Sequence, residues 1–160
     1  MKEFTKEDSL IQLKGSDLFE NTLMLRFRYD HDEFTWEGIR TNWTLERGQR
    51  EFICLNFDDV SYFKRIIPEK HNNKFRDVIS EFYSENFSGT YESESSSIHE
   101  EKGSYKIAIT LPYLLGKITF SFDRVMLRSK IGLGEQIASN TWQYKDLETG
   151  VPFDFYRPFE

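Results

Sequence analysis

The sequence predicts a single α+β domain: a mainly antiparallel β-sheet with two central helices packed on one face. Strand-like segments precede and follow a central stretch with helical spacing, an order typical of this class. The chain contains 15 Phe, 8 Tyr and 3 Trp but only two alanines, Ala108 and Ala138, a composition that favours strands over helices. With 160 residues and no linker, residues 1–160 are expected to share one core.

Three strands are predicted before the helices. Residues 22–29 alternate apolar and polar side chains, which indicates a strand with one buried face. Residues 34–45 change their alternation around Gly38, so we expect a bulge at that glycine. Residues 50–57 are apolar on both faces, which favours a central position in the sheet.

Two helices are predicted in the middle of the chain. The Asp58–Asp59 pair would cap a short helix that Pro68 ends. Its apolar residues are Val60, Phe63, Ile66 and Ile67. A second helix would begin after Asn72 or Asn73, because the following apolar residues have the spacing of one helical face. They are Phe75, Val78, Ile79, Phe82 and Tyr83.

Strands are expected to return after a polar segment. Residues 88–104 are acidic and rich in serine, which predicts a flexible loop or a weak hairpin. Alternation predicts strands at residues 105–111, 117–122 and 136–144, whereas residues 125–133 are compatible with either helix or strand.

The last segment of the sequence, PFDFYRPF, is too aromatic to stay loose in water. It would either close over the core or form an exposed patch that makes a homodimer. Its aromatic residues are Phe153, Phe155, Tyr156 and Phe159.

Charge and cysteine content narrow the class of protein. The 27 acidic and 21 basic residues give a net charge of −6, which disfavours broad binding to nucleic acid. The single Cys54 allows no internal disulfide and fits a reducing compartment. The first residues lack the apolar stretch of a secretory signal, and no apolar run is long enough for a membrane span. We therefore expect a cytoplasmic protein that does not cross a membrane.

Motifs for catalysis, metals or cofactors are missing from the sequence. His31, His71 and His99 are too far apart to match a metal motif, and Cys54 lies in an apolar strand without an adjacent base. The Gly132–Leu133–Gly134 stretch lacks the third glycine of a dinucleotide loop. We therefore predict no catalytic residue, cofactor or metal ligand, although an active site assembled from distant residues is a third hypothesis for function.

The acidic excess is concentrated between Arg76 and Lys102. This stretch contains no Lys or Arg, and its seven acids are Asp77, Glu81, Glu85, Glu92, Glu94, Glu100 and Glu101. In the predicted second helix, acids recur every four residues, a spacing that costs about 0.2–0.5 kcal/mol per like-charged pair. Local stability does not explain this arrangement. It is either a solvated face or a surface that binds a basic protein, with Tyr83 and Tyr91 as aromatic anchors.

The size, acidity, single cysteine and absence of catalytic motifs resemble bacterial toxin-neutralising immunity proteins, including those of contact-dependent inhibition systems. The resemblance rests on these general properties and implies no particular fold. It implies a non-enzymatic, toxin-neutralising inhibitor. The acidic surface itself suggests how such an inhibitor would act, because many nuclease active sites are cationic and an acidic helix and loop would occupy one in place of nucleic acid.

The alternative is a module that binds a small ligand or single-stranded nucleic acid with aromatic and basic side chains. The candidate basic residues are Arg26, Arg28, Arg40, Lys64, Arg65, Arg124, Arg128 and Lys130.

Overall fold

A computed structural model describes residues 1–15, 18, 22–66, 91–92, 95–101, 103–110 and 116–160. Within these ranges the chain has one helix, α1 (Lys6–Gly15). The strands are β1 (Lys2–Glu3), β2 (Thr22–Asp30), β3 (Glu33–Arg40), β4 (Gln49–Asp58), β5 (Ser61–Ile66), β6 (Tyr91–Glu92), β7 (Ser95–Glu101), β8 (Ser104–Thr110), β9 (Lys117–Phe122), β10 (Arg124–Ala138), β11 (Thr141–Asp146) and β12 (Pro152–Phe153). No helix in the described ranges is long and apolar enough to cross a membrane.

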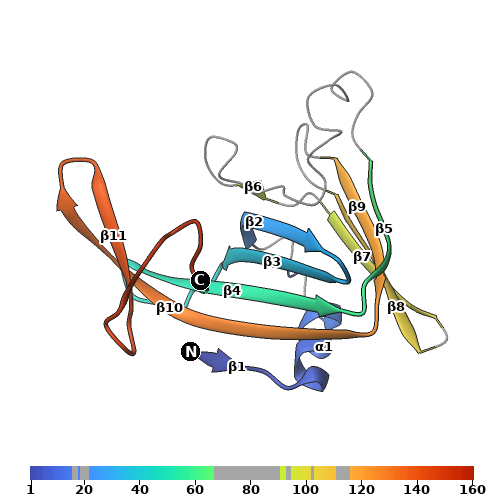
Figure 1. The fold of residues 1–160 in the computed structure, drawn as a ribbon. Coiled ribbons are helices and arrows are strands. Elements are labelled where there is room, and N and C mark those ends of the chain that lie inside the picture. The colour runs from blue at the N-terminus through green and yellow to red at the C-terminus, as the bar shows by residue number, and fades with distance from the viewer. Residues whose placement is uncertain (16–17, 19–21, 67–90, 93–94, 102, 111–115) are drawn as a thin grey trace.

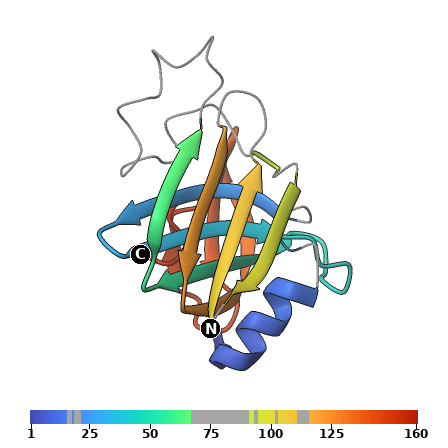
Figure 2. The same ribbon diagram turned by 90° about the vertical axis from the view of Figure 1, so that its right-hand side faces the viewer.

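The strands form two antiparallel sheets. The larger sheet has eight strands in the order β12-β11-β10-β4-β3-β2-β6, with β1 also paired to β10. The smaller has four, in the order β5-β9-β8-β7. Figures 1 and 2 show the strands of the smaller sheet crossing those of the larger sheet steeply, with α1 beside one end of the stack. Two sheets that cross in this way enclose a core between their facing sides.

Large aromatic rings fill the space between the sheets. Phe34 and Phe57 from the larger sheet meet Phe120 from the smaller sheet, with ring centroids 4.7 and 5.2 Å from that of Phe120. Trp36 is fully buried in the same cluster. This core explains the composition, because a few large rings on strands replace the small aliphatic residues of a helix bundle.

The first and third predicted strands are confirmed as β2 and β4. The second is confirmed as β3 only as far as Arg40, because residues 41–45 lie in the loop that follows it. The predicted bulge is misplaced. The register of β3 against β4 is continuous through Gly38, and the irregularity lies in the facing β2 between Met24 and Arg26. A Cβ atom at Gly38 would lie 2.6 Å from the Trp36 ring and 2.7 Å from the Leu23 carbonyl oxygen. The glycine therefore permits a close approach between neighbouring strands.

The predicted fold class is wrong, because two central helices do not cover the sheet. The first predicted helix is strand β5, which pairs with β9. Asp59 and Tyr62 have φ angles of 56° and 54°, left-handed values that a helix cannot contain. Val60 and Phe63 imitate helical spacing because the register of β5 shifts between Ser61 and Lys64. The second predicted helix, residues 72–83, lies outside the described residues.

The later part of the chain is richer in strands than expected. Within the segment 88–104, which was expected to be a loop or a weak hairpin, residues 95–101 form β7, and this strand pairs with β8. The strands expected at 105–111 and 117–122 are confirmed as β8 and β9. Residues 125–133 belong to β10, and residues 136–144 span the end of β10, a turn and the start of β11.

Helix α1 was not predicted. Thr5 caps it, because the Asp8 amide donates to the Thr5 hydroxyl oxygen at 3.1 Å. The buried Ser9 hydroxyl accepts a hydrogen bond from the Leu127 amide at 2.9 Å, which ties the helix to β10. Leu13 joins the core between the sheets. The Thr5–Asp8 capping pattern was the available signal in the sequence.

Candidate functional site: a groove lined by tryptophan and arginine

The structure describes only some of the residues of the predicted acidic surface. Asp77, Glu81, Tyr83, Glu85 and Glu94 lie outside the described residues. Tyr91 and Glu92 form β6 at the edge of the larger sheet, whereas Glu100 and Glu101 belong to β7 of the smaller one. The Glu100 carboxylate is exposed and lies 4.0 Å from Nζ of Lys14 on α1. The described members are therefore divided between two sheets.

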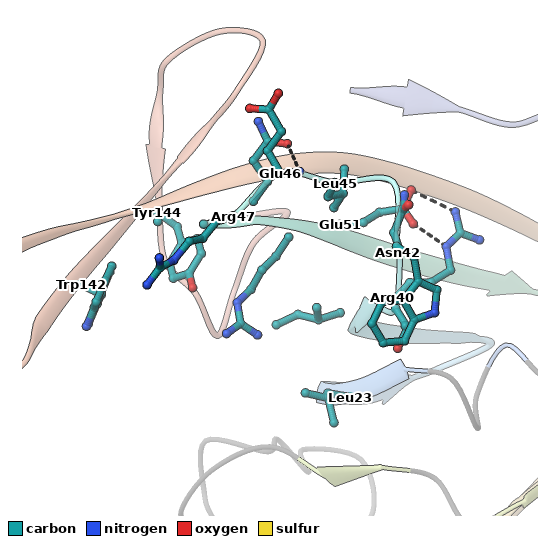
Figure 3. Close-up of a pocket in the computed structure, with 16 residues that line it drawn as sticks. Leu23, Arg40, Asn42, Leu45, Glu46, Arg47, Glu51, Trp142 and Tyr144 are labelled. Atoms are coloured by element: carbon teal, nitrogen blue, oxygen red, sulfur yellow. Dashed lines mark hydrogen bonds and ion pairs between the residues drawn. The ribbon is translucent and has the colours of Figure 1, made fainter.

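A groove of about 670 Å³ lies between the loop that joins β3 to β4 and the hairpin of β10 and β11. Trp43 of the loop and Trp142 of the hairpin line it, with 94% and 60% of their surfaces exposed. Figure 3 shows Trp142 and Tyr144 on one side of this space and Arg40 on the other. The chain has three tryptophans, and two of them are thus presented to solvent at one site.

The loop of residues 41–48 is held in place by short-range hydrogen bonds. The Asn42 side-chain oxygen accepts from the Thr44 amide at 3.0 Å and from the Thr44 hydroxyl at 2.6 Å. The Glu46 amide donates to the Gln49 side chain at 3.2 Å. Such Asx-type turns fix a loop that would otherwise be mobile. Trp43 is therefore carried on an ordered platform.

The two walls of the groove are also joined. The Gly134 amide of β10 donates a hydrogen bond to the Gly48 carbonyl of the loop at 2.9 Å. Gly48 has a φ angle of +85°, a conformation that favours glycine. A Cβ atom at Gly134 would lie 2.9 Å from the Tyr144 ring, so glycine at this position lets the ring lie against β10. The Gly-Leu-Gly stretch makes room for aromatic rings and does not form a phosphate loop.

Three arginines line the groove, and they differ in their partners. The Arg40 guanidinium pairs with the Glu51 carboxylate through two contacts of 2.6 and 3.2 Å, and it also donates to Gln12 at 3.3 Å. Arg47 and Arg50 are exposed, and neither forms an ion pair with any residue that the structure describes. These two cations are therefore available to an incoming carboxylate or phosphate.

The basic residues of the alternative hypothesis are dispersed over the molecule. Only Arg40 lines the groove. Arg26 is buried beside Glu37, with 2.9 Å between Nε and the carboxylate, and burial lowers the pKa of Arg65 to about 10. Arg124 contacts Asp59 at 3.4 Å. Arg128 and Lys130 lie over aromatic rings of the last segment.

Cys54 and His31, for which the sequence predicts no catalytic or metal-binding role, occupy a buried strand and an exposed turn. Cys54 is fully buried, and burial raises the pKa of its thiol to about 11, so it is neutral at physiological pH. His31 occupies the exposed turn between β2 and β3 beside Asp30. In the described part of the chain, no three His, Cys, Asp or Glu side chains are placed to hold a metal ion.

Sequence reasoning missed Trp43, Arg47, Arg50, Trp142 and Tyr144 as a group. The predicted strand over residues 34–45 included Trp43, and the available signal against it was local, because polar residues surround Trp43 and Gly48 follows. No family model matches the chain, and no curated protein or solved structure is significantly similar to it.

Proposed function

We propose that this protein is a non-enzymatic binding protein that recognises another protein through the groove. The observation that carries the proposal is the exposure of Trp43 and Trp142 on one ordered groove that also presents Arg47 and Arg50. Tryptophan, tyrosine and arginine are the residue types that contribute most of the binding energy at protein interfaces. Exposed rings gathered at one site are unfavourable in isolation and are explained by a partner that covers them.

The shape of the groove favours a protein over a small molecule. Its volume of about 670 Å³ would hold a small ligand, but such sites bury most of their ligand. Here Trp43, Arg47 and Arg50 are all exposed on one wall, so a small ligand would remain largely in solvent. A protein segment laid along the groove would cover both tryptophans at once.

The acidic segment supplies the second part of the proposal. Its concentrated negative charge would steer a basic partner, such as a nuclease toxin domain, towards the protein. Glu100, which is exposed on β7, is a described member of this surface. The groove would then provide the short-range contacts, in which Arg47 and Arg50 meet carboxylates of the partner. We therefore place the protein among toxin-neutralising inhibitors of the immunity type, acting in the cytoplasm.

Binding of single-stranded nucleic acid is the second candidate function. It is favoured by the two exposed tryptophans and two exposed arginines in one groove, because bases stack on such rings while phosphates contact the cations. Against it stand the exposed Glu46 in the same lining and the net charge of −6. The protein partner is therefore the better supported proposal.

The proposal is tested by measuring whether the purified protein captures the protein that the adjacent gene encodes. The double variant Trp43→Ala/Trp142→Ala should weaken capture by about thirtyfold or more, the effect of removing interface hot spots. Tyr62→Ala is the matched control, because Tyr62 is 85% exposed on β5 and does not line the groove. It should leave capture unchanged.

Two other outcomes would replace the proposal. Unchanged capture by the tryptophan variant, with loss in Glu81→Lys/Glu85→Lys, would move the contact surface to the acidic segment. Retention of a labelled single-stranded oligonucleotide at low salt by the wild type, and its loss in the tryptophan variant, would establish the second candidate function.

A further inference from the structure

The outer face of the larger sheet, away from the core between the sheets, is covered by the chain's own residues 152–160. Figure 1 shows the chain after β11 turning back across β10 and β4. A second cluster of buried residues, Leu25, Ile39 and Phe52, lies on this face. Phe153, Phe155, Tyr156 and Phe159 pack against it and are each only partly buried. The segment closes over the sheet, which was the first of the two alternatives for it; a homodimer through it stays a prediction.

Side chains, more than backbone pairing, hold this segment. Its ladder to β11 consists of two residue pairs, Tyr144 with Phe153 and Lys145 with Pro152. The Phe52 ring meets the rings of Phe153 and Phe155 edge-on, with centroids 5.0 and 5.8 Å apart. A segment bound by ring contacts with so little strand pairing is attached in the way that a docked peptide is attached.

The sheet is shaped to receive these rings. A Cβ atom at Gly132 would lie 2.6 Å from the Phe52 ring and 2.7 Å from the Phe153 ring. Any larger residue at Gly132 would therefore push the two rings apart. The position of glycine on β10 creates an aromatic site on the sheet face.

Cations of the sheet complete the site. Lys130 Nζ lies 4.0 Å from the Phe153 ring centroid and 5.0 Å from that of Phe159, and it donates a hydrogen bond to the Pro158 carbonyl. The Arg128 guanidinium lies 5.3 Å from the Phe159 ring centroid. Both contacts are attractive because the face of an aromatic ring carries partial negative charge.

A buried arginine receives the carboxylate of the segment. The Arg26 side chain is 5% exposed, and its guanidinium donates to the Glu160 carboxylate at 2.8 Å while Glu37 contacts Nε at 2.9 Å. The Glu160 side chain is 46% exposed. An almost fully buried cation thus faces a carboxylate that solvent reaches.

We propose that this face is a peptide-recognition site, that residues 152–160 are its resident ligand, and that a partner segment with the same groups binds it by displacing them. The partner segment carries aromatic residues that contact Phe52 and Lys130. Next to its last aromatic residue it carries a carboxylate that pairs with Arg26. The proposal does not depend on the groove. The two sites share one side chain, because Tyr144 lines the groove and also contacts Phe153 and Phe155.

The experiment uses the full chain with a protease site introduced beside Gly150, in the turn before the segment. After cleavage, a fluorescein-labelled peptide of residues 151–160 is added, and its uptake is followed by fluorescence anisotropy. Uptake with retained circular dichroism is expected. Peptides carrying Phe159→Ala or Glu160→Gln should bind about tenfold more weakly, because the first loses the ring contacts with Arg128 and Lys130 and the second loses the charged contact with Arg26.

Two results would overturn the proposal. A cleaved protein that stays folded but takes up no labelled peptide would show that the segment is a permanent part of the fold. A protein that unfolds when the segment is released would show the same. The Trp43→Ala/Trp142→Ala variant serves as the internal control: its peptide uptake should equal that of the wild type even if the groove proves to bind no partner.

Discussion

The backbone amide of Gly134 donates a hydrogen bond to the carbonyl of Gly48 at 2.9 Å, and this bond joins the two walls of the groove. One wall carries Trp43 and the other carries Trp142. Because the backbone elements that carry the rings are joined before any partner arrives, little backbone entropy remains to be lost on binding. A preorganised groove is the property that the proposed recognition requires.

Substitution of Gly134 should disturb this arrangement through Tyr144. The Cβ atom of Gly134→Ala would lie 2.9 Å from the Tyr144 ring, and we expect the overpacking to lower the free energy of unfolding by about 1–3 kcal/mol. Urea denaturation measures this change. In a Tyr144→Ala background the same substitution should cost much less. An equal cost in both backgrounds would mean that the ring does not occupy the position described.

The three tryptophans should be distinguishable by fluorescence. Trp36 is fully buried, whereas Trp43 and Trp142 are 94% and 60% exposed. The double variant Trp43→Phe/Trp142→Phe should therefore lose the emission that acrylamide quenches and retain the blue-shifted emission of Trp36. Strong quenching of the remaining tryptophan would contradict the core between the two sheets.

The buried ion pair of Arg26 and Glu37 should show strong coupling. Arg26→Met leaves the Glu37 carboxylate buried without its partner, which costs about 3–5 kcal/mol of folding free energy. The double variant Arg26→Met/Glu37→Leu removes both charges and should cost far less. Denaturant unfolding of both single variants and the double variant gives the coupling energy, and additive effects would argue against the pair.

The folding stability of the protein should depend on pH in the alkaline range because of the buried Cys54 thiol. Burial raises its pKa from 9.0 to about 11, so the stabilising effect of keeping it neutral is complete below pH 9 and is lost as the pH rises towards 11. Relative to Cys54→Ala, the wild type should lose about 2–3 kcal/mol across this interval.

A chemical measurement accompanies that comparison. A thiol-specific reagent at pH 8 should label Cys54 only after unfolding, because the side chain is fully buried. Rapid labelling of the folded protein, or parallel stability profiles for the wild type and Cys54→Ala, would contradict this assignment.

The sequence predicts the strands well where alternation is regular. Residues 22–29 show this pattern because the strand lies in one sheet and has defined faces, and the short apolar run of residues 50–57 is equally readable because β4 is buried in the middle of the larger sheet. The error at residues 59–66 has a physical origin. The left-handed residues Asp59 and Tyr62 carry the chain from one sheet into the other, and the resulting irregular spacing of apolar residues resembles that of a helix.

The groove could not be predicted from local patterns in the sequence. Trp43 and Trp142 are distant in the sequence, and they share a site only because β10 pairs with β4 and its extension reaches the loop at Gly48. Local patterns carry no information on such pairing. The acidic segment, in contrast, is visible in the sequence because it is contiguous, but its predicted helix lies outside the described residues.

The most direct test of the proposed recognition is acrylamide quenching of tryptophan fluorescence during titration with the captured partner. Because Trp43 and Trp142 supply the exposed emission, their quenching constant should fall as the partner covers the groove. The double variant Trp43→Phe/Trp142→Phe should show no change. A complex that forms while the quenching of wild-type tryptophan stays constant would contradict the groove as the binding site.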